Sequence, residues 1–285
     1  MLRFRTLLVL ITLAPVVFAI EPPAPIVPET VVVPSGKLRL KAFLWKPTGS
    51  GPFPAVLFNH GSGGPDADHT AGMRVTEAAE KLAPLFLKHG YAFLYLFRRG
   101  QGLSVDQGPF MQDILRSEEA NNGANARHHL QLVLATTEHL DDVLAALAFL
   151  KAAPAVDAKR TAIAGHSFGG QLTLLAAERD NAVGAVVTFA AAADSWNRSP
   201  ELQERLRTAA KRATAPIMLI QTANDYSTAP SEALADELER LHKPYLLKIY
   251  PPVGKTPDDG HNFLYVAIPQ WEHEVFGFLD KYLKR

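Results

Sequence analysis

The chain has 285 residues, of which 47% are hydrophobic and 20% are charged, and these proportions are typical of a globular protein. Lysine plus arginine and aspartate plus glutamate number 29 each, so no excess of positive charge favours nucleic acid or an anionic membrane surface as a partner. The chain contains no cysteine, which excludes a disulfide scaffold and a lipid anchor on cysteine.

The N-terminal segment has the three parts of a secretory signal peptide. Arg3 and Arg5 precede an apolar run, and small or β-branched residues lead up to Ala19. The run includes Pro15 and is short for a membrane span. We therefore expect cleavage after Ala19, export to the periplasm or medium, and no stable membrane insertion of the mature chain. Residues 20–30 are rich in proline and are expected to form a linker before a single domain over residues 31–285.

The domain is expected to begin with a hairpin and to continue as alternating strands and helices. Residues 31–33 and 37–45, separated by Pro34-Ser35-Gly36, predict an antiparallel β-hairpin. The later predicted strands are 53–58, 91–97, the run that ends near residue 165, 183–189, 216–221 and 245–250, with helices near 75–89, 140–150, 168–178, 200–212, 231–241 and 271–283. This alternation predicts an α/β fold with a mostly parallel, doubly wound sheet flanked by helices. The polar, less periodic segment 104–127 is a possible lid.

A short glycine-rich motif lies where an apolar strand gives way to a helix pattern. Gly165-His166-Ser167-Phe168-Gly169 fits the G-x-S-x-G nucleophile elbow, in which the glycines permit a tight turn that presents the serine hydroxyl at the end of a strand. The helix that follows directs its free N–H groups at the same place, where they can receive negative charge. Ser167 is therefore the candidate nucleophile.

The candidate base and acid follow the elbow in the chain. His261 lies in a predicted loop after the last strand, and Asp225 comes just after the predicted strand 216–221. The order Ser167, Asp225, His261 is the order expected of an α/β-hydrolase triad. Asp194, which follows the preceding strand, is the alternative acid, whereas the aspartates nearest to His261 in sequence are expected to be solvated.

The second group of candidates is an oxyanion hole. Residues 60–64 follow an early strand and are rich in glycine, so their backbone N–H groups can approach a substrate oxygen. We expect the N–H groups of Phe168 and Ser62 to be the two donors, with Gly61 and Gly63 as alternatives to Ser62. His60 is expected to be a structural residue.

The turn Arg98-Arg99-Gly100-Gln101-Gly102 contains a glycine pair but lacks the Lys-Ser/Thr ending of a phosphate-binding loop. We expect its glycines to form a turn and one arginine to pair with a carboxylate inside the fold. No group of His, Asp or Glu residues has the spacing of metal ligands, so no metal or organic cofactor is expected.

Taken together, these residues resemble the α/β-hydrolase superfamily, and within it the dienelactone-hydrolase branch, over residues 31–285. The similarity rests on residues 60–61, 99–104, 141–143, 156–160 and 165–170, together with Asp225 and His261. Dienelactone hydrolase is similar in fold but has a cysteine nucleophile, which this chain lacks, so the lactone substrate does not follow from the resemblance. The string 165–170 also resembles the catalytic domains of prolyl-oligopeptidase-type enzymes.

The predicted function is hydrolysis of a small-molecule carboxylic ester through an acyl-enzyme intermediate on Ser167. Because about one helix is available as a cover between residues 189 and 216, we expect an open site that accepts small or soluble esters. Two alternatives remain open at this point. One is a serine peptidase, and the other is a catalytically silent hydrolase fold that acts as a binding module.

Overall fold

The computed structural model describes residues 27–63 and 73–284. One eight-stranded sheet runs through the molecule in the order β1-β2-β4-β3-β5-β6-β7-β8. The strands are β1 (Glu29–Ser35), β2 (Leu38–Trp45), β3 (Phe53–Asn59), β4 (Ala92–Phe97), β5 (Val156–His166), β6 (Ala185–Phe189), β7 (Ile217–Thr222) and β8 (Tyr245–Tyr250). The pairs β1–β2 and β2–β4 are antiparallel and the other pairs are parallel.

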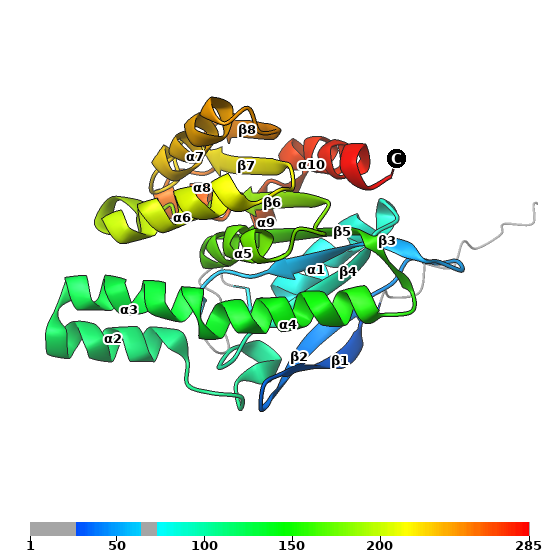
Figure 1. The fold of residues 1–285 in the computed structure, drawn as a ribbon, viewed down its shortest axis with the longest axis horizontal. Helices are drawn as coiled ribbons and strands as arrows, with labels where there is room; N and C mark the ends of the chain where they lie inside the picture. The colour runs from blue at the N-terminus through cyan, green and yellow to red at the C-terminus, as the bar shows by residue number, and fades with distance from the viewer. Residues whose placement is uncertain (1–26, 64–72, 285) are drawn as a thin grey trace, which may run out of the picture.

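Helices cover both faces of the sheet (Figure 1). They are α1 (Val75–Lys88), α2 (Met111–Asn122), α3 (Ala124–Thr136), α4 (Glu138–Ala152), α5 (Phe168–Arg179), α6 (Pro200–Arg212), α7 (Ala229–Arg240), α8 (Pro257–His261), α9 (Phe263–Val266) and α10 (Ile268–Leu283), with short 3-10 helices η1 (Gly102–Ser104) and η2 (Trp196–Arg198). The prediction of a mostly parallel sheet flanked by helices, with an antiparallel N-terminal hairpin, is confirmed.

Two hydrophobic layers hold the helices to the sheet. On one face, α4, α5, α6 and α7 pack against the strands through aliphatic side chains such as Leu147 and Leu172. On the other face, α1, α9 and α10 pack through an aromatic-rich layer that includes Phe93 and Trp271. Strands β3, β4, β6 and β7 are buried on both faces apart from Phe53, which explains their continuously apolar sequences.

The parallel register brings the carboxyl ends of the central strands to one edge. Asn59 pairs with Gly165, His166 pairs with Phe189, and Phe189 pairs with Ile220. The segments that follow β3, β5, β6 and β7 therefore begin beside one another. In a doubly wound sheet this edge is where ligands bind.

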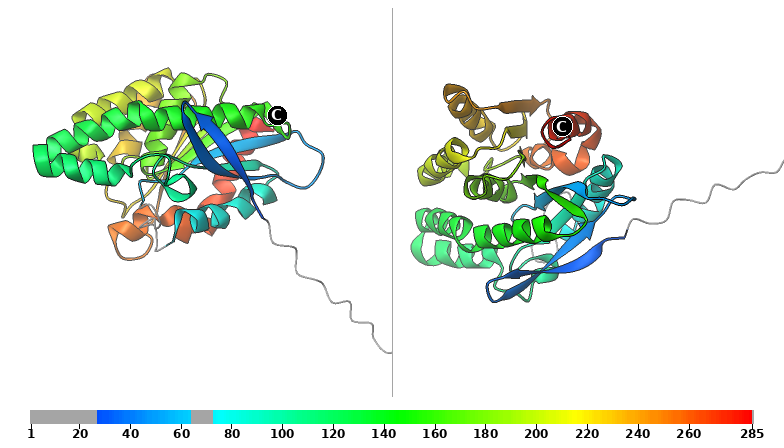
Figure 2. Two further views of the ribbon diagram at one scale, coloured as in Figure 1. Left: turned by 90° about the horizontal axis from the view of Figure 1, so that it is seen from below. Right: turned by 45° about the vertical axis from the view of Figure 1, so that its right-hand side comes forward.

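Two differences from the sequence-based prediction concern the linker and the polar segment that follows β4. Strand β1 begins at Glu29, two residues inside the predicted linker. The polar segment 104–127 contains α2 and the start of α3, which lie side by side and extend beyond the sheet (Figure 1, Figure 2). Their hydrophobic pattern is weak because only Met111 and Leu115 of α2, and Leu134 and Ala135 of α3, are buried.

The predicted signal peptide, residues 1–19, and most of the predicted linker lie outside the described residues. Among the helices that the structure describes, none combines the length and the apolar character needed to cross a membrane.

Candidate active site

Ser167 occupies a strained turn between β5 and α5. Its φ and ψ angles are 55° and −120°, a region that costs a non-glycine residue about 1–3 kcal/mol. Glycines on both sides make the turn possible: a Cβ on Gly165 would lie 2.4 Å from Gly169 O, and one on Gly169 would lie 2.0 Å from Asn59 O. The Ser167 N–H donates to Phe189 O over 2.8 Å, which ties the turn to the end of β6. The elbow thus brings α5 against β3 and presents the serine at the sheet edge.

His261 ends α8, whereas the sequence analysis placed it in a loop. The helix forms because Thr256 caps it: the Thr256 hydroxyl accepts from the Asp259 N–H, and the Asp259 carboxylate accepts from the Thr256 N–H. Pro257 at the first helical position is also favourable. The cap fixes the end of the helix so that His261 Nε2 lies 2.9 Å from Ser167 Oγ. This distance allows the imidazole to take the hydroxyl proton.

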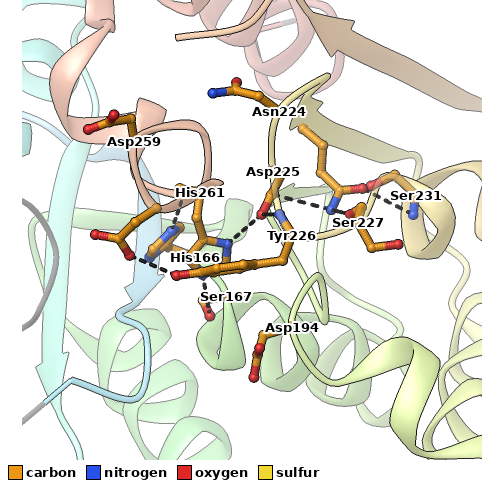
Figure 3. A network of polar contacts seen from close by, with 12 residues as sticks. His166, Ser167, Asp194, Asn224, Asp225, Tyr226, Ser227, Ser231, Asp259 and His261 are labelled. Atoms are coloured by element: carbon orange, nitrogen blue, oxygen red, sulfur yellow. Dashed lines mark hydrogen bonds and ion pairs between the residues drawn. The ribbon is translucent and has the colours of Figure 1, made fainter. Parts of the chain in front are cut away.

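Asp225 lies against the other side of the His261 ring, as Figure 3 shows. Its Oδ1 is 2.8 Å from His261 Nδ1 and also accepts from the Tyr226 N–H over 2.7 Å, while Gln221 Nε2 lies 3.4 Å from Oδ2. The Asp225 side chain is fully buried. Because a carboxylate only accepts hydrogen bonds, His261 carries its proton on Nδ1 and directs the free pair of Nε2 at Ser167.

The other aspartates near the site have different partners. Asp194 lines the same cavity but pairs with Arg198, and its side chain is 56% exposed. Asp258 Oδ1 accepts from the Tyr226 hydroxyl over 2.8 Å, and Asp259 caps α8. The structure therefore brings Asp225, and not Asp194, to His261.

The glycine-rich segment after β3 lines the cavity beside Ser167. Its carbonyl groups are held from inside the protein, since buried Arg98 donates to His60 O over 2.8 Å and to Gly61 O over 2.6 Å. The N–H of Ser62 belongs to the same peptide group as Gly61 O, and in a trans peptide it points the opposite way, away from Arg98. As expected, His60 is a buried residue, and burial holds the pKa of its ring well below the usual value.

The second arginine of the turn confirms the expected internal ion pair. Arg99 Nη2 and Nε lie 2.7 and 2.9 Å from the two carboxylate oxygens of Asp142, whose side chain is fully buried. The Ser35 hydroxyl donates to the same carboxylate over 2.9 Å. The hydrogen bonds to Asp142 raise the pKa of Arg99. Together with the Ser35 contact, they link α4 to β1 and to the turn after β4. The pair supports the fold behind the site and does not line the cavity.

A cavity of about 440 Å³ opens above Ser167, within the size range of small-molecule sites. Its lining is mostly polar and includes residues that the sequence analysis did not single out. They are Phe110, which caps α2, Gln112 and Arg116 of α2 and Gln131 of α3, beside Gln171, Ser195, Tyr226 and Asn262. The possible lid thus forms one wall of the cavity. Within residues 27–63 and 73–284, no group of three or more His, Asp or Glu side chains could hold a metal ion.

A sheet of this topology, with serine, histidine and aspartate hydrogen-bonded in series at its carboxyl edge, defines the chain as an α/β-hydrolase. A family model narrows the class. The chain belongs to the dienelactone hydrolase family, whose model matches residues 40–265.

Three known proteins illustrate the similarity. The quorum-quenching protein AidA of Acinetobacter baumannii is 29% identical over 175 residues, which are 61% of this chain and 47% of that protein. Dienelactone hydrolase from Anabaena variabilis superposes with a TM-score of 0.59 at 22% identity, covering 90% of this chain and 99% of that one. Acylaminoacyl peptidase from Pyrococcus horikoshii gives 0.63 at 20% identity, covering 90% and 42%. At these identities the two structures support the fold, and the chain spans about half the length of the matched relative.

Proposed function

We propose that this hydrolase cleaves carboxylic esters with Ser167 as the nucleophile. The observation that carries the proposal is the unbroken series of hydrogen bonds from Ser167 Oγ through the His261 ring to the Asp225 carboxylate. As Ser167 attacks the ester carbonyl, His261 takes its proton and then returns it to the leaving alcohol. Water then hydrolyses the acyl-enzyme by the same steps. Asp225 orients the imidazole and stabilises its charged form throughout.

The oxyanion of each tetrahedral intermediate is expected to bind to the N–H groups of Phe168 and Ser62. Phe168 begins α5, so its N–H is one of the helix N-terminal donors that lack an intrahelical partner. Arg98, by holding the Gly61 carbonyl, turns the Ser62 N–H to the opposite side. These contacts support the assignment, since two donors at the developing charge are the largest single source of catalysis in such enzymes.

The cavity supports small, polar esters as substrates. Its lining is rich in amide and hydroxyl side chains, and long alkyl chains would gain little from such a surface. The proposal predicts that short-chain esters are hydrolysed much faster than long-chain esters.

The test is hydrolysis of a short-chain p-nitrophenyl ester by the folded wild type and by the Ser167→Ala variant. We expect the variant to lose activity by at least about a thousandfold. An aminoacyl anilide measured in parallel tests the peptidase alternative, and equal or faster anilide cleavage would overturn the ester assignment. A folded wild type that is inactive on both substrates and resists a fluorophosphonate would favour a binding module.

We also propose that the chain is exported, because residues 1–19 have the pattern of a signal peptide. N-terminal sequencing of the secreted or periplasmic chain should give Ile20 as the first residue. An intact N-terminus on cytosolic protein would contradict the proposal.

A further inference from the structure

His166 is the last residue of β5 and directly precedes Ser167, and its side chain, which contributes to the cavity lining, is almost fully buried. Its ring centre lies 4.9 Å from that of His261 and 5.3 Å from that of Tyr265, which it meets edge to face. Its Nε2 is 2.9 Å from the main-chain oxygen of His261 (Figure 3). His166 therefore forms a hydrogen bond with the backbone of His261, whose side chain is the proposed base.

The direction of this hydrogen bond fixes the state of the His166 ring. A carbonyl oxygen only accepts, so His166 Nε2 carries the hydrogen and Nδ1 keeps its free electron pair. Burial, reinforced by the neighbouring charge of His261, lowers the pKa of His166 to about 3. The ring is therefore neutral at any pH at which a serine hydrolase works, and it cannot act as a second base.

The Nδ1 side of the ring faces the glycine-rich segment after β3, which includes Gly61 and Ser62. A Cβ placed on Gly61 would lie 3.3 Å from His166 Nδ1 and 3.5 Å from Ser167 Cβ, so the ring and the Gly61 backbone are in close contact. His166 is thus wedged between the segment that holds Ser62 and the end of α8. The neutral side chain of His166, the residue next to the nucleophile in the chain, therefore separates the segment that holds Ser62 from the end of α8, which carries His261.

We propose that His166 is a positioning residue, whose Nε2–H bond to His261 O holds α8 so that the His261 ring stays within reach of Ser167. The inference rests on the proposed function of Ser167 and His261. Displacing a catalytic group by about 1 Å can lower turnover by about a hundredfold. Loss of the hydrogen bond should therefore lower kcat and leave substrate binding in the cavity nearly unchanged.

Two substitutions separate this role from a general need for a polar side chain. The amide nitrogen of glutamine reaches about as far from the backbone as His166 Nε2, whereas that of asparagine reaches only as far as Nδ1. We expect His166→Gln to keep kcat within about threefold of wild type and His166→Asn to lower it by about 10- to 100-fold, with KM changed by less than about threefold in both. Midpoints of thermal unfolding should be similar for the two variants.

Rates of Ser167 labelling by a fluorophosphonate separate this inference from the proposed function. A folded wild type that is not labelled contradicts the proposed function. A wild type that is labelled rapidly, with His166→Asn labelled equally rapidly, or with both variants equally slow, overturns the positioning role. If neither variant folds, long-range 1H–15N NMR of the wild-type histidines decides: a neutral Nε2–H ring for His166 is expected, and an Nδ1–H or charged ring at neutral pH overturns the inference.

Discussion

Replacing Asp225 by asparagine removes one charge from the site and keeps the shape of the side chain. If the new NH2 group takes the place of Oδ1, it meets the N–H groups of Tyr226 and His261, which lie 2.7 and 2.8 Å from that oxygen. The amide should therefore place its oxygen there and its nitrogen toward Gln221, where the contact is longer, at 3.4 Å. The bond to His261 survives in this orientation, and what is lost is the negative charge.

The cost follows from the burial of that charge. Two opposite charges about 4 Å apart interact by about 4 kcal/mol at an effective dielectric constant of about 20, the value that suits sites in proteins. This attraction exists only after His261 has taken the proton, so its loss raises the barrier and lowers kcat by about a thousandfold. The effect on KM should be small.

The assay is steady-state hydrolysis of a short-chain p-nitrophenyl ester, and Asp194→Asn is the matched control. Asp194 lines the same cavity, but it is half-exposed and pairs with Arg198, so its variant should keep kcat within about threefold. The reasoning is refuted if Asp225→Asn keeps more than about a tenth of the wild-type kcat, or if Asp194→Asn loses as much as Asp225→Asn.

Three further predictions concern stability. Gly169→Ala should destabilise the fold by more than about 4 kcal/mol, because the new Cβ would overlap the backbone of β3. At Gly277 in helix α10 a new Cβ would meet nothing within 4 Å, so Gly277→Ala should stabilise the fold by about 0.5–1 kcal/mol. Equal urea midpoints for the two variants would contradict this prediction. Asp142→Ala leaves the Arg99 guanidinium without its carboxylate partner and should lower the free energy of unfolding in urea by about 3–5 kcal/mol. Glu138→Ala removes an exposed carboxylate 3.5 Å from Arg99 and should change that free energy by less than about 1 kcal/mol. The buried His166 has a pKa of about 3, against about 6.5 in the unfolded chain. As the pH falls below about 6.5, the unfolded state therefore takes up the proton first. The free energy of unfolding then falls by about 1.4 kcal/mol for each unit that the pH is lowered between these two values. Between about pH 6.5 and about pH 5, the slope of the free energy of unfolding against pH should be smaller in His166→Gln by about 1.4 kcal/mol per pH unit. An unchanged slope would contradict a neutral, buried His166.

The sequence was sufficient to predict the class of fold, and the three residues that it singled out as a candidate triad lie together in the structure. The alternation of strands and helices, the G-x-S-x-G string and the chain order of Ser167, Asp225 and His261 each have a local signature. The competition between Asp194 and Asp225 could not be decided in this way, because both follow neighbouring strands. The structure places Asp225 beside His261, whereas Asp194 pairs with Arg198.

Two features of the site had weaker signals. The short helix α8 could have been found, since Thr256, Pro257 and Asp259 form a capping box with a proline at the first position. The wall formed by α2 and α3 had little hydrophobic periodicity, because these helices pack mainly on each other and stay largely exposed. The contact of His166 with His261 joins residues 95 positions apart, and no local pattern predicts it.

The most direct test of the account is to find where a fluorophosphonate attaches to the folded enzyme. Trypsin cuts after Arg160 and Arg179, and Ser167 is the only serine in the peptide between them. We predict one adduct per chain, on Ser167, with labelling strongly slowed in His261→Ala. An adduct on another residue, or no adduct on a folded chain that still hydrolyses esters, would contradict the account.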